Sequence, residues 1–188
     1  MSTSTILLLL IVGAVLYAVY LYNRLVSLRQ TADAAWSDID VQLKRRYNLI
    51  PALVETVKGY KNYEADTLEK VVKARQLGMN AGSVKEHEQA DTMLTQALGK
   101  LFALAEAYPD LKANENFLNL QQQLSEIEDA IQNARRYYNA VVRDYNTRIE
   151  SFPDNLIAQK YHFTPKEFFE LEESEKAAVK KMPEIKFD

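Results

Sequence analysis

Hydrophobic side chains crowd the first part of the chain, and no charged side chain interrupts them. Residues 1–23 contain no Asp, Glu, Lys or Arg. The strongly apolar run from Ile6 to Tyr22 would measure roughly 25 Å as a helix, at ~1.5 Å per residue. That length is just enough for a bilayer core, and tyrosines at its far end suit the headgroup layer. We therefore predict a transmembrane anchor made by Ile6, Leu7, Leu8, Leu9, Leu10, Ile11, Val12, Val15, Leu16, Tyr17, Val19, Tyr20, Leu21 and Tyr22.

A cleaved signal peptide is the alternative interpretation of this segment. It requires a basic start and a cleavage site of small residues. Residues 2–5 are Ser-Thr-Ser-Thr, and bulky Tyr and Leu fill the end of the run, so we favour an uncleaved anchor. Basic residues follow the run, beginning with Arg24 and Arg29, and none precedes it. The positive-inside rule then predicts an N-terminus outside and the larger part of the chain in the cytoplasm.

Helical periodicity continues beyond the anchor. Between Leu25 and Gln76 there is one Pro and one Gly, which predicts one long helix that Pro51 kinks near Tyr47. Its apolar positions recur in steps of three and four, at Trp36, Ile39, Leu43, Tyr47, Ile50, Val54 and Val57. The residues from Leu77 to Ser83 indicate a stop and a turn.

Two further long helices are predicted after this turn. The first covers about Val84 to Ala107, and a turn at Tyr108-Pro109-Asp110 follows it. The next starts near Asn114 as its cap and ends before Pro153. Heptad spacing is clearest in this helix, at Phe117, Leu120, Leu124, Ile127, Ile131, Ala134, Tyr138, Val141 and Tyr145.

The C-terminal part of the chain has shorter predicted elements than the preceding helices, and it contains more aromatic residues. A brief helix is expected from Ser151-Phe152-Pro153-Asp154 through Ala158. The capping box that starts at Thr164 predicts another helix to about Lys180, and residues 182–187 look extended. We expect six apolar residues to close the bundle core: Phe152, Leu156, Ile157, Phe163, Phe168 and Phe169.

These elements predict an all-α fold, in which a transmembrane helix continues into an antiparallel bundle of three long helices plus short C-terminal helices. The expected division is an anchor over residues 1–23 and a soluble bundle over residues 24–188. Only five Gly and five Pro among 188 residues argue against an all-β fold. The net charge of −3 gives no sign of nucleic-acid binding, and the lack of cysteine excludes disulfides and thiolate sites.

Several motifs resemble those of the bacterial LemA family, in order and over essentially the whole chain. They are Ala35-Trp36-Ser37-Asp38-Ile39-Asp40-Val41-Gln42-Leu43-Lys44-Arg45-Arg46, Asn48-Leu49-Ile50-Pro51, Leu53-Val54-Glu55, Val57-Lys58-Gly59-Tyr60, Tyr108-Pro109-Asp110-Leu111, Tyr145-Asn146, Phe152-Pro153 and Pro183 to Phe187. The resemblance implies a single-pass anchor in the cytoplasmic (inner) membrane of a bacterium and a cytoplasmic antiparallel helical bundle. It implies no reaction, and related proteins in magnetosome membrane formation point to membrane organisation.

The sequence contains no clear catalytic or metal-binding motif. A di-iron bundle needs Glu-x-x-His pairs, but Val84 and Gln159 stand three residues before the histidines at 87 and 162. No compact nucleophile–base group stands out, and Gly78 and Gly82 suit a helix-ending turn better than a phosphate loop. We expect no catalytic residue, metal, cofactor or small-molecule substrate.

A polar interaction cluster is the strongest candidate outside the apolar stripes: Asp38, Asp40, Lys44, Arg45 and Arg46. Asp40 and Lys44 are spaced to pair on one helix face, and Arg45 or Arg46 could reach acids such as Glu128 on another helix. Arg45 would lie roughly 35 Å beyond the anchor, which is farther than a Debye length of ~8 Å, so we favour a structural role over lipid binding. Tyr138-Asn139 and Tyr145-Asn146 repeat on one face, and we favour register-setting contacts over a binding groove there.

The lengths of the helices predict a self-associating surface next to the membrane. The second long helix is too short to reach back along residues 25–49, which would leave an apolar stripe uncovered. Its candidate residues are Leu25, Leu28, Ala32, Ala35, Trp36 and Ile39, and cover from residues 152–187 is the open alternative. The leading function is a non-enzymatic, self-associating membrane scaffold. An adaptor or modulator of another membrane complex, such as a protease or signalling system, is the alternative, and an unrecognised enzyme is a third class.

Overall fold

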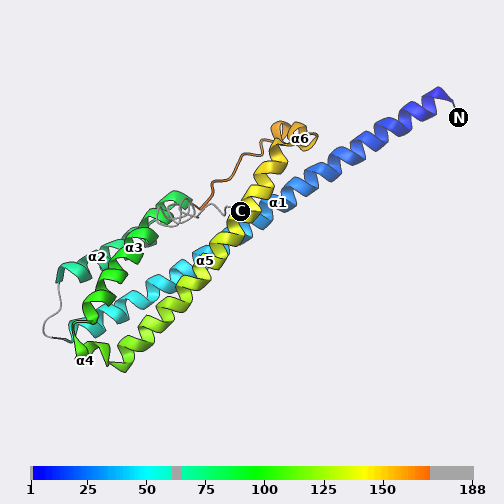
Figure 1. The fold of residues 1–188 in the computed structure, drawn as a ribbon. Coiled ribbons are helices and arrows are strands. Elements are labelled where there is room, and N and C mark those ends of the chain that lie inside the picture. The colour runs from blue at the N-terminus through cyan, green and yellow to red at the C-terminus, as the bar shows by residue number, and fades with distance from the viewer. Residues whose placement is uncertain (1, 61–64, 170–188) are drawn as a thin grey trace, which may run out of the picture. The chain divides into compact units, whose positions relative to one another are not determined.

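The structure is a computed structural model that describes residues 2–60 and 65–169, and that part contains six helices and no strand (Figure 1). The predicted all-α class is confirmed. The long N-terminal helix is apolar at its start and packs against later helices further along.

Helix α1, Thr3–Lys58, runs for 56 residues and includes Pro51. The prediction that this helix continues to Gln76 is wrong, because α1 ends at Lys58 and Gly59 follows. Glycine is among the weakest residues in a helix interior, and here the Tyr60 N–H closes a turn on the Val57 carbonyl, 3.1 Å away. A separate helix, α2, Ala65–Met79, covers the last part of the predicted one.

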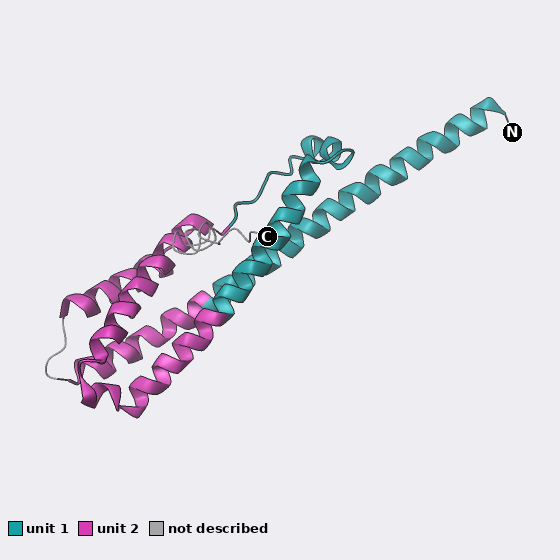
Figure 2. Ribbon diagram, in the orientation of Figure 1, with its two compact units in different colours: residues 1–42, 130–168 teal, residues 43–129, 169–188 magenta. Residues whose placement is uncertain are grey.

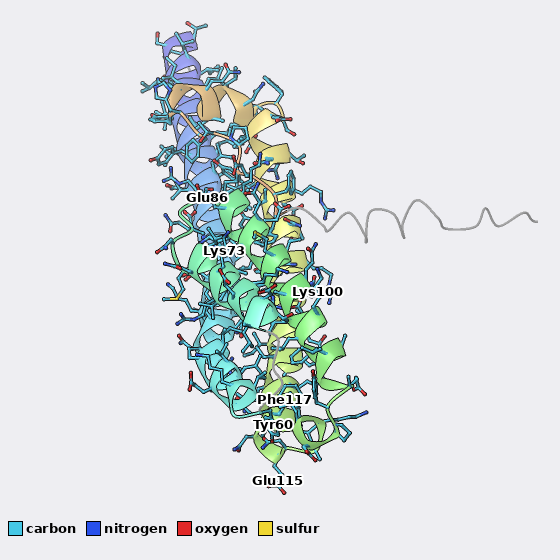
Figure 3. All side chains as sticks on the ribbon, turned by 90° about the vertical axis from the view of Figure 1, so that its left-hand side faces the viewer. Tyr60, Lys73, Glu86, Lys100, Glu115 and Phe117 are labelled. Carbon is cyan, nitrogen blue, oxygen red and sulfur yellow. The ribbon has the colours of Figure 1, made fainter. Side chains whose placement is uncertain are left out.

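Helices α2 and α3 pack against each other, and α3 spans Val84–Ala105, close to its predicted bounds. Ser83 caps α3, with its hydroxyl accepting from the Glu86 N–H at 3.2 Å, and the Glu86 carboxylate accepts from the Gly82 N–H at 2.7 Å. These reciprocal bonds satisfy amide groups that a helix start leaves without partners. Glu86 marks this start in Figure 3.

Helix α4, Pro109–Lys112, occupies the predicted turn, and α5, Glu115–Glu150, is the predicted third long helix. The expected cap is confirmed, since the Asn114 side-chain oxygen accepts from the Phe117 N–H at 2.9 Å. The Asn114 amide also donates to the Tyr60 hydroxyl at 2.9 Å.

The chain forms two compact units, which Figure 2 colours separately. Unit 1 comprises residues 1–42 and 130–168, and unit 2 comprises residues 43–129 and 169–188. Helices α1 and α5 contribute to both. The division into an anchor, 1–23, and a bundle, 24–188, concerns the bilayer and stays a prediction.

Unit 1 has a small core where α1, α5 and the C-terminal segment meet. Leu25 of α1 packs with Tyr145 and Ile149 of α5, and with Ala158 and Phe163 from the segment after α5. Leu25 is fully buried there. Residues of α5 and of the segment after it therefore cover α1 at Leu25, within the stretch that the helix lengths predict to be uncovered.

The core of unit 2 uses the predicted stripe of α1. Residues 43, 47, 50, 54 and 57 are all buried, as expected from their spacing. Helices α2 and α3 contribute buried aliphatic residues to the unit, namely Leu68, Val71, Ala74, Leu94, Leu98 and Leu101.

Helix α5 buries one predicted row of residues and shifts the other. The row Phe117, Leu124, Ile131, Tyr138 and Tyr145 is buried as predicted. In the second predicted row Ile127 is buried, but Leu120, Ala134 and Val141 are only half-buried, whereas Arg135, Val142 and Ile149 are buried. A straight helix with 3.6 residues per turn drifts against a strict seven-residue repeat, so a step of four replaces one of three.

The prediction of a helix from Thr164 is wrong for the residues that the structure describes. Helix α6 spans Asp154–Lys160, as expected, but residues 163–169 form no helix. Lys180 and the stretch 182–187 lie outside the described residues. Of the six apolar residues assigned to the core, Phe163 and Phe169 are buried and Ile157 is half-buried. Phe152, Leu156 and Phe168 are exposed, which corrects the prediction for them.

Candidate functional site

The start of α1 is the most apolar exposed surface of the described chain. By length and composition, α1 is the single helix in the described part that could cross a membrane, with a mean hydropathy of 2.4 over its best window. Only 6% of that window is buried inside the molecule. The predicted anchor residues from Ile6 to Tyr20 are exposed accordingly, but Leu21 is only 5% exposed and packs into unit 1. Intramolecular packing therefore begins one residue before Tyr22.

Aromatic side chains mark the place where the exposed run ends. Tyr17 and Tyr20 stack with ring centroids 6.4 Å apart. Tyr22 contacts Tyr161 and Phe163 of the C-terminal segment, at centroid distances of 4.8 Å and 5.9 Å. This junction fixes the segment that follows α6 beside the end of the apolar run.

The stripe predicted for self-association is covered by the chain itself. Leu25, Ala32, Ala35 and Ile39 are at most 1% exposed, and Leu28 and Trp36 are half-buried. The prediction that this stripe lies uncovered is wrong, because α5 and the segment after it pack along it. Trp36, for example, lies against Tyr138 with centroids 5.6 Å apart. The cover comes from α5 together with Ala158 and Phe163, so the alternative of cover from residues 152–187 is observed only in part.

A row of polar side chains on α5 holds the backbone of residues 164–167. Asn146 pairs twice with Lys166, donating to its carbonyl and accepting from its N–H, both at 2.9 Å. The Tyr145 hydroxyl donates to the Thr164 carbonyl at 3.0 Å, and the Tyr138 hydroxyl donates to the Glu167 carbonyl at 2.8 Å. The repeated Tyr and Asn positions thus set the register of the chain's own C-terminal segment.

Charge and burial act together on these tyrosines. Burial, and then the nearby Glu167 and Asp33 carboxylates, raise the pKa of Tyr138 from 10.0 to about 12. Burial also raises the pKa of Tyr145, although the Arg29 guanidinium opposes the shift. Asp33 has a partner as well, since the Lys166 ammonium lies 2.5 Å from its carboxylate.

The five residues of the predicted polar cluster do not form one surface, because Arg46 is buried. Arg46 is 3% exposed and lies inside unit 2, where its guanidinium contacts Asp91 at 2.6 Å and Glu128 at 2.9 Å. A third bond joins it to the Thr95 hydroxyl at 3.0 Å. Asp38, Lys44 and Arg45 are exposed, and Asp40 is half-buried. The contact with Glu128 that the sequence allowed for Arg45 or Arg46 is made by Arg46.

Two grooves lined by basic residues occur among the described residues, one in each unit. In unit 2, Lys70 and Lys73 of α2 face Lys100 of α3 across a groove of about 220 Å³, and Figure 3 labels the last two. In unit 1, Arg24 of α1 and Arg143 and Arg148 of α5 line a groove of about 370 Å³. Neither groove is predicted from the sequence, because nothing in a single sequence reveals which turns of two helices lie side by side, such as the turn of α5 beside Arg24.

Metal-binding side chains do not gather in the described ranges. No group of three His, Asp or Glu residues is placed there to hold an ion. The expectation that the protein has no metal and no catalytic residue stays a prediction.

Comparison with known proteins identifies the chain. The sequence model of the LemA family matches residues 35–187. The chain belongs to the LemA family. It is 29% identical over 177 residues to Protein LemA of Metamycoplasma hominis, covering 93% of this chain and 81% of that protein.

Other similar proteins are named as magnetosome proteins. The chain is 27% identical over 175 residues to Magnetosome protein MamQ 2 of Paramagnetospirillum magneticum, covering 79% of this chain. It is 25% identical over 174 residues to Magnetosome protein MamQ of Magnetospirillum gryphiswaldense. The chain spans 64% of the length of each MamQ protein, so the likeness to them is partial.

Proposed function

We propose that this LemA-family protein is a non-enzymatic scaffold held by one transmembrane helix in the inner membrane of a bacterium. The observation that carries the proposal is the continuity of α1. A single helix begins as an exposed, uncharged apolar span and continues, with no loop between, into a face buried by α5 and α6. A span that enters a packed unit directly holds that unit at the membrane surface.

The orientation in this proposal places the N-terminus outside and the helical units in the cytoplasm. Arg24 and Arg29 follow the span closely, and residues 1–23 contain no basic side chain. Basic residues stay preferentially on the cytoplasmic side during insertion. Both arginines belong to unit 1, which also contains the span.

The use of the buried polar groups supports a structural role. Arg46 joins α1 to Asp91 of α3 and to Glu128 of α5. Tyr138, Tyr145 and Asn146 of α5 hold the backbone of residues 164–167. These groups stabilise the arrangement of helices, which is what a protein that displays surfaces to partners requires.

Self-association remains part of the proposal, but it needs a surface other than the covered stripe of α1. Copies anchored in one bilayer are parallel and locally concentrated, which raises their effective concentration for one another. An organising role is also in keeping with three relatives that are magnetosome proteins. The alternative is an adaptor or modulator of another membrane complex, such as a protease or a signalling system.

Mass photometry of the detergent-solubilised full chain, followed by crosslinking in native membranes, separates these functions. A large assembly of identical copies supports the scaffold. A defined complex with a different membrane protein supports the adaptor. A monomer that crosslinks to nothing in the membrane contradicts both.

A further inference from the structure

Unit 1 exposes large apolar side chains at α6 and at both of its ends. Phe152 is 79% exposed, Leu156 is 58% exposed and Tyr161 is 52% exposed. Lys160 lies four residues after Leu156, on the same exposed face of the helix. Neighbouring apolar residues of this size are unusual on a surface that meets only water.

The orientation of α6 is fixed from its opposite side. Ala158 and Phe163 are buried in the core of unit 1 with Leu25. The helix end is closed by the Phe163 N–H, which donates to the Ala158 carbonyl at 2.9 Å, while His162 takes a left-handed conformation with φ of 56°. This is the arrangement in which a residue past the helix end folds back onto the helix. The exposed face of α6 is therefore held in place.

The position of α6 coincides with the end of the apolar span. Tyr22 closes the apolar run of α1, and its ring lies 4.8 Å from that of Tyr161. Figure 1 shows α6 beside α1 at the level where the rest of the N-terminal helix continues alone. A bilayer that surrounds residues 6–20 would have its headgroup layer at this level, because those residues are the exposed ones.

The arginine-lined groove of unit 1 lies along the same end of α1 and α5. Arg24, Arg143 and Arg148 line it together with the hydroxyl-bearing Thr147 and Ser151. Asp144 is the acidic side chain of the lining, 3.9 Å from Arg143, and Arg148 lies 3.7 Å from the buried Asp154. Three arginines against one lining carboxylate make this groove basic in a chain whose net charge is −3.

We propose that α6 and Phe152 lie in the headgroup layer that the span of α1 enters, and that the arginine groove binds the phosphate of an anionic phospholipid. This inference rests on the proposed membrane anchor. Arginine forms paired hydrogen bonds with phosphate oxygens, and the two hydroxyls of the groove can add single ones. Tyr and Phe rings favour the boundary between hydrocarbon and water, and the Lys160 ammonium can extend from that boundary to the headgroups.

The depth of α6 is measured with single cysteines, which this cysteine-free chain accepts without background. The full chain carries Leu156→Cys, Val12→Cys in the span or Ala34→Cys on an exposed turn of α1, roughly 18 Å beyond Tyr22. Each cysteine bears an environment-sensitive fluorophore, in nanodiscs of phosphatidylcholine and phosphatidylglycerol that contain a headgroup-level lipid quencher. We expect strong quenching at Leu156 and little at Ala34.

The Val12 label tests the membrane anchor separately from the docking of α6. Quenching at Val12 by a quencher placed in the acyl chains, with Leu156 behaving like Ala34, would overturn the docking of α6 and leave the anchor intact. No lipid quenching at Val12 would overturn both. A Leu156 label shielded from water but untouched by lipid quenchers would mean that a protein covers α6, and this too would overturn the inference.

The groove is tested with Arg24→Gln/Arg143→Gln in the full chain, which leaves Arg148 beside Asp154. Lys70→Gln/Lys73→Gln removes the same charge from the groove of unit 2 and is the matched control. Native mass spectrometry of protein released from nanodiscs reports the phosphatidylglycerol retained. We expect affinity to fall about fivefold for each arginine removed and to stay unchanged in the lysine variant. Equal losses in both variants, or displacement of the lipid by free glycerol phosphate at a matching concentration, would overturn a lipid site in this groove.

Discussion

A few buried positions are sensitive to substitution because they hold a charge or have no room for a larger side chain. Arg46 is the clearest case, since its guanidinium contacts Asp91 and Glu128 in a region almost closed to water. A buried charge is tolerated only when paired, so each partner stabilises the others. Gly78 is a second case, because it is buried against the ring of Tyr47.

Replacing Arg46 should be strongly destabilising. Arg46→Ala leaves the carboxylate of Asp91, which is 1% exposed, without its cationic partner. We expect a loss of about 3–5 kcal/mol in the free energy of unfolding, measured by chemical denaturation. The neighbouring Arg45→Ala removes an exposed arginine from the same helix and should cost less than about 1 kcal/mol, the usual limit for a surface ion pair. Similar losses in the two variants would contradict the role given to Arg46.

Two glycines in helices should respond to alanine in opposite directions. A methyl group at Gly78 would overlap the Tyr47 ring, whereas one at Gly99 meets nothing within 4 Å. We expect Gly78→Ala to destabilise by about 1–3 kcal/mol through overpacking. Gly99→Ala should stabilise by about 0.5–1 kcal/mol, because alanine loses less backbone entropy in an exposed helix. Thermal unfolding of both variants tests the pair, and a stabilised Gly78→Ala would refute the contact.

At the scale of elements, the sequence predicts helices better than it predicts what covers them. The spacing in α1 and α5 is enough to predict Leu43, Ile50 and Ile131 as core residues, because their burial follows from helical periodicity alone. The course of residues 163–169 could not be predicted. A capping box at Thr164 favours a helix locally, but the hydrogen bonds from Asn146 to Lys166 outweigh that preference.

Asn146 should be the residue that most directly holds this segment. Asn146→Ala removes both hydrogen bonds with the Lys166 backbone. We expect the Lys166 amide to lose protection from hydrogen exchange by about 1–3 kcal/mol, while the middle of α3 stays unaffected. Asn133→Ala, at an exposed position of α5, is the control. Unchanged exchange at Lys166 would mean that Asn146 does not hold the segment.

Alkaline pH should release the same segment through Tyr138. Burial raises the pKa of this phenol from 10.0 to about 12, so the folded chain keeps a proton that the unfolded chain has lost between those values. The stabilisation is complete below about pH 10 and disappears as the pH rises toward about 12. Ultraviolet titration of tyrosinate, together with stability measured against pH, tests this. Tyr138→Phe should remove this pH dependence, and Tyr137→Phe, at an exposed neighbour, should retain it.

At the scale of the whole molecule, composition predicts the span, but the surroundings of that span need the structure. An uncharged run of this hydropathy is recognisable in any sequence. The exposure of Phe152 and Leu156 cannot be recognised from the sequence, because aromatic and aliphatic residues after a long helix could equally well be buried in the core. Arg24 stands beside the span in the sequence, whereas Arg143 and Arg148 reach its groove only through the antiparallel pairing of α5 with α1 in unit 1.

The proposed orientation rests on the basic residues that follow the span and the lack of any before it. We expect a C-terminal reporter that works only in the cytoplasm to be active, and N-terminal sequencing of the membrane-bound protein to begin before Tyr20. Adding lysines at Ser2 and Ser4 while changing Arg24 and Arg29 to Gln should reduce the share of molecules in this orientation. A reporter active only outside the cytoplasm would refute the orientation, and a mature N-terminus well beyond Tyr20 would refute the anchor.

The absence of a hinge in α1, across the residues described, has a mechanical consequence. A flexible linker would let the span and the unit that follows it move independently. In a continuous helix, a change in the tilt of the span also changes the tilt of that unit. In a thinner membrane a span of fixed apolar length tilts, and in a thicker one it straightens. In the proposed arrangement unit 1 rotates with the continuous helix α1, and α6 presses into the headgroups or lifts from them. Bilayer thickness would thereby become a signal that the protein reads as an angle.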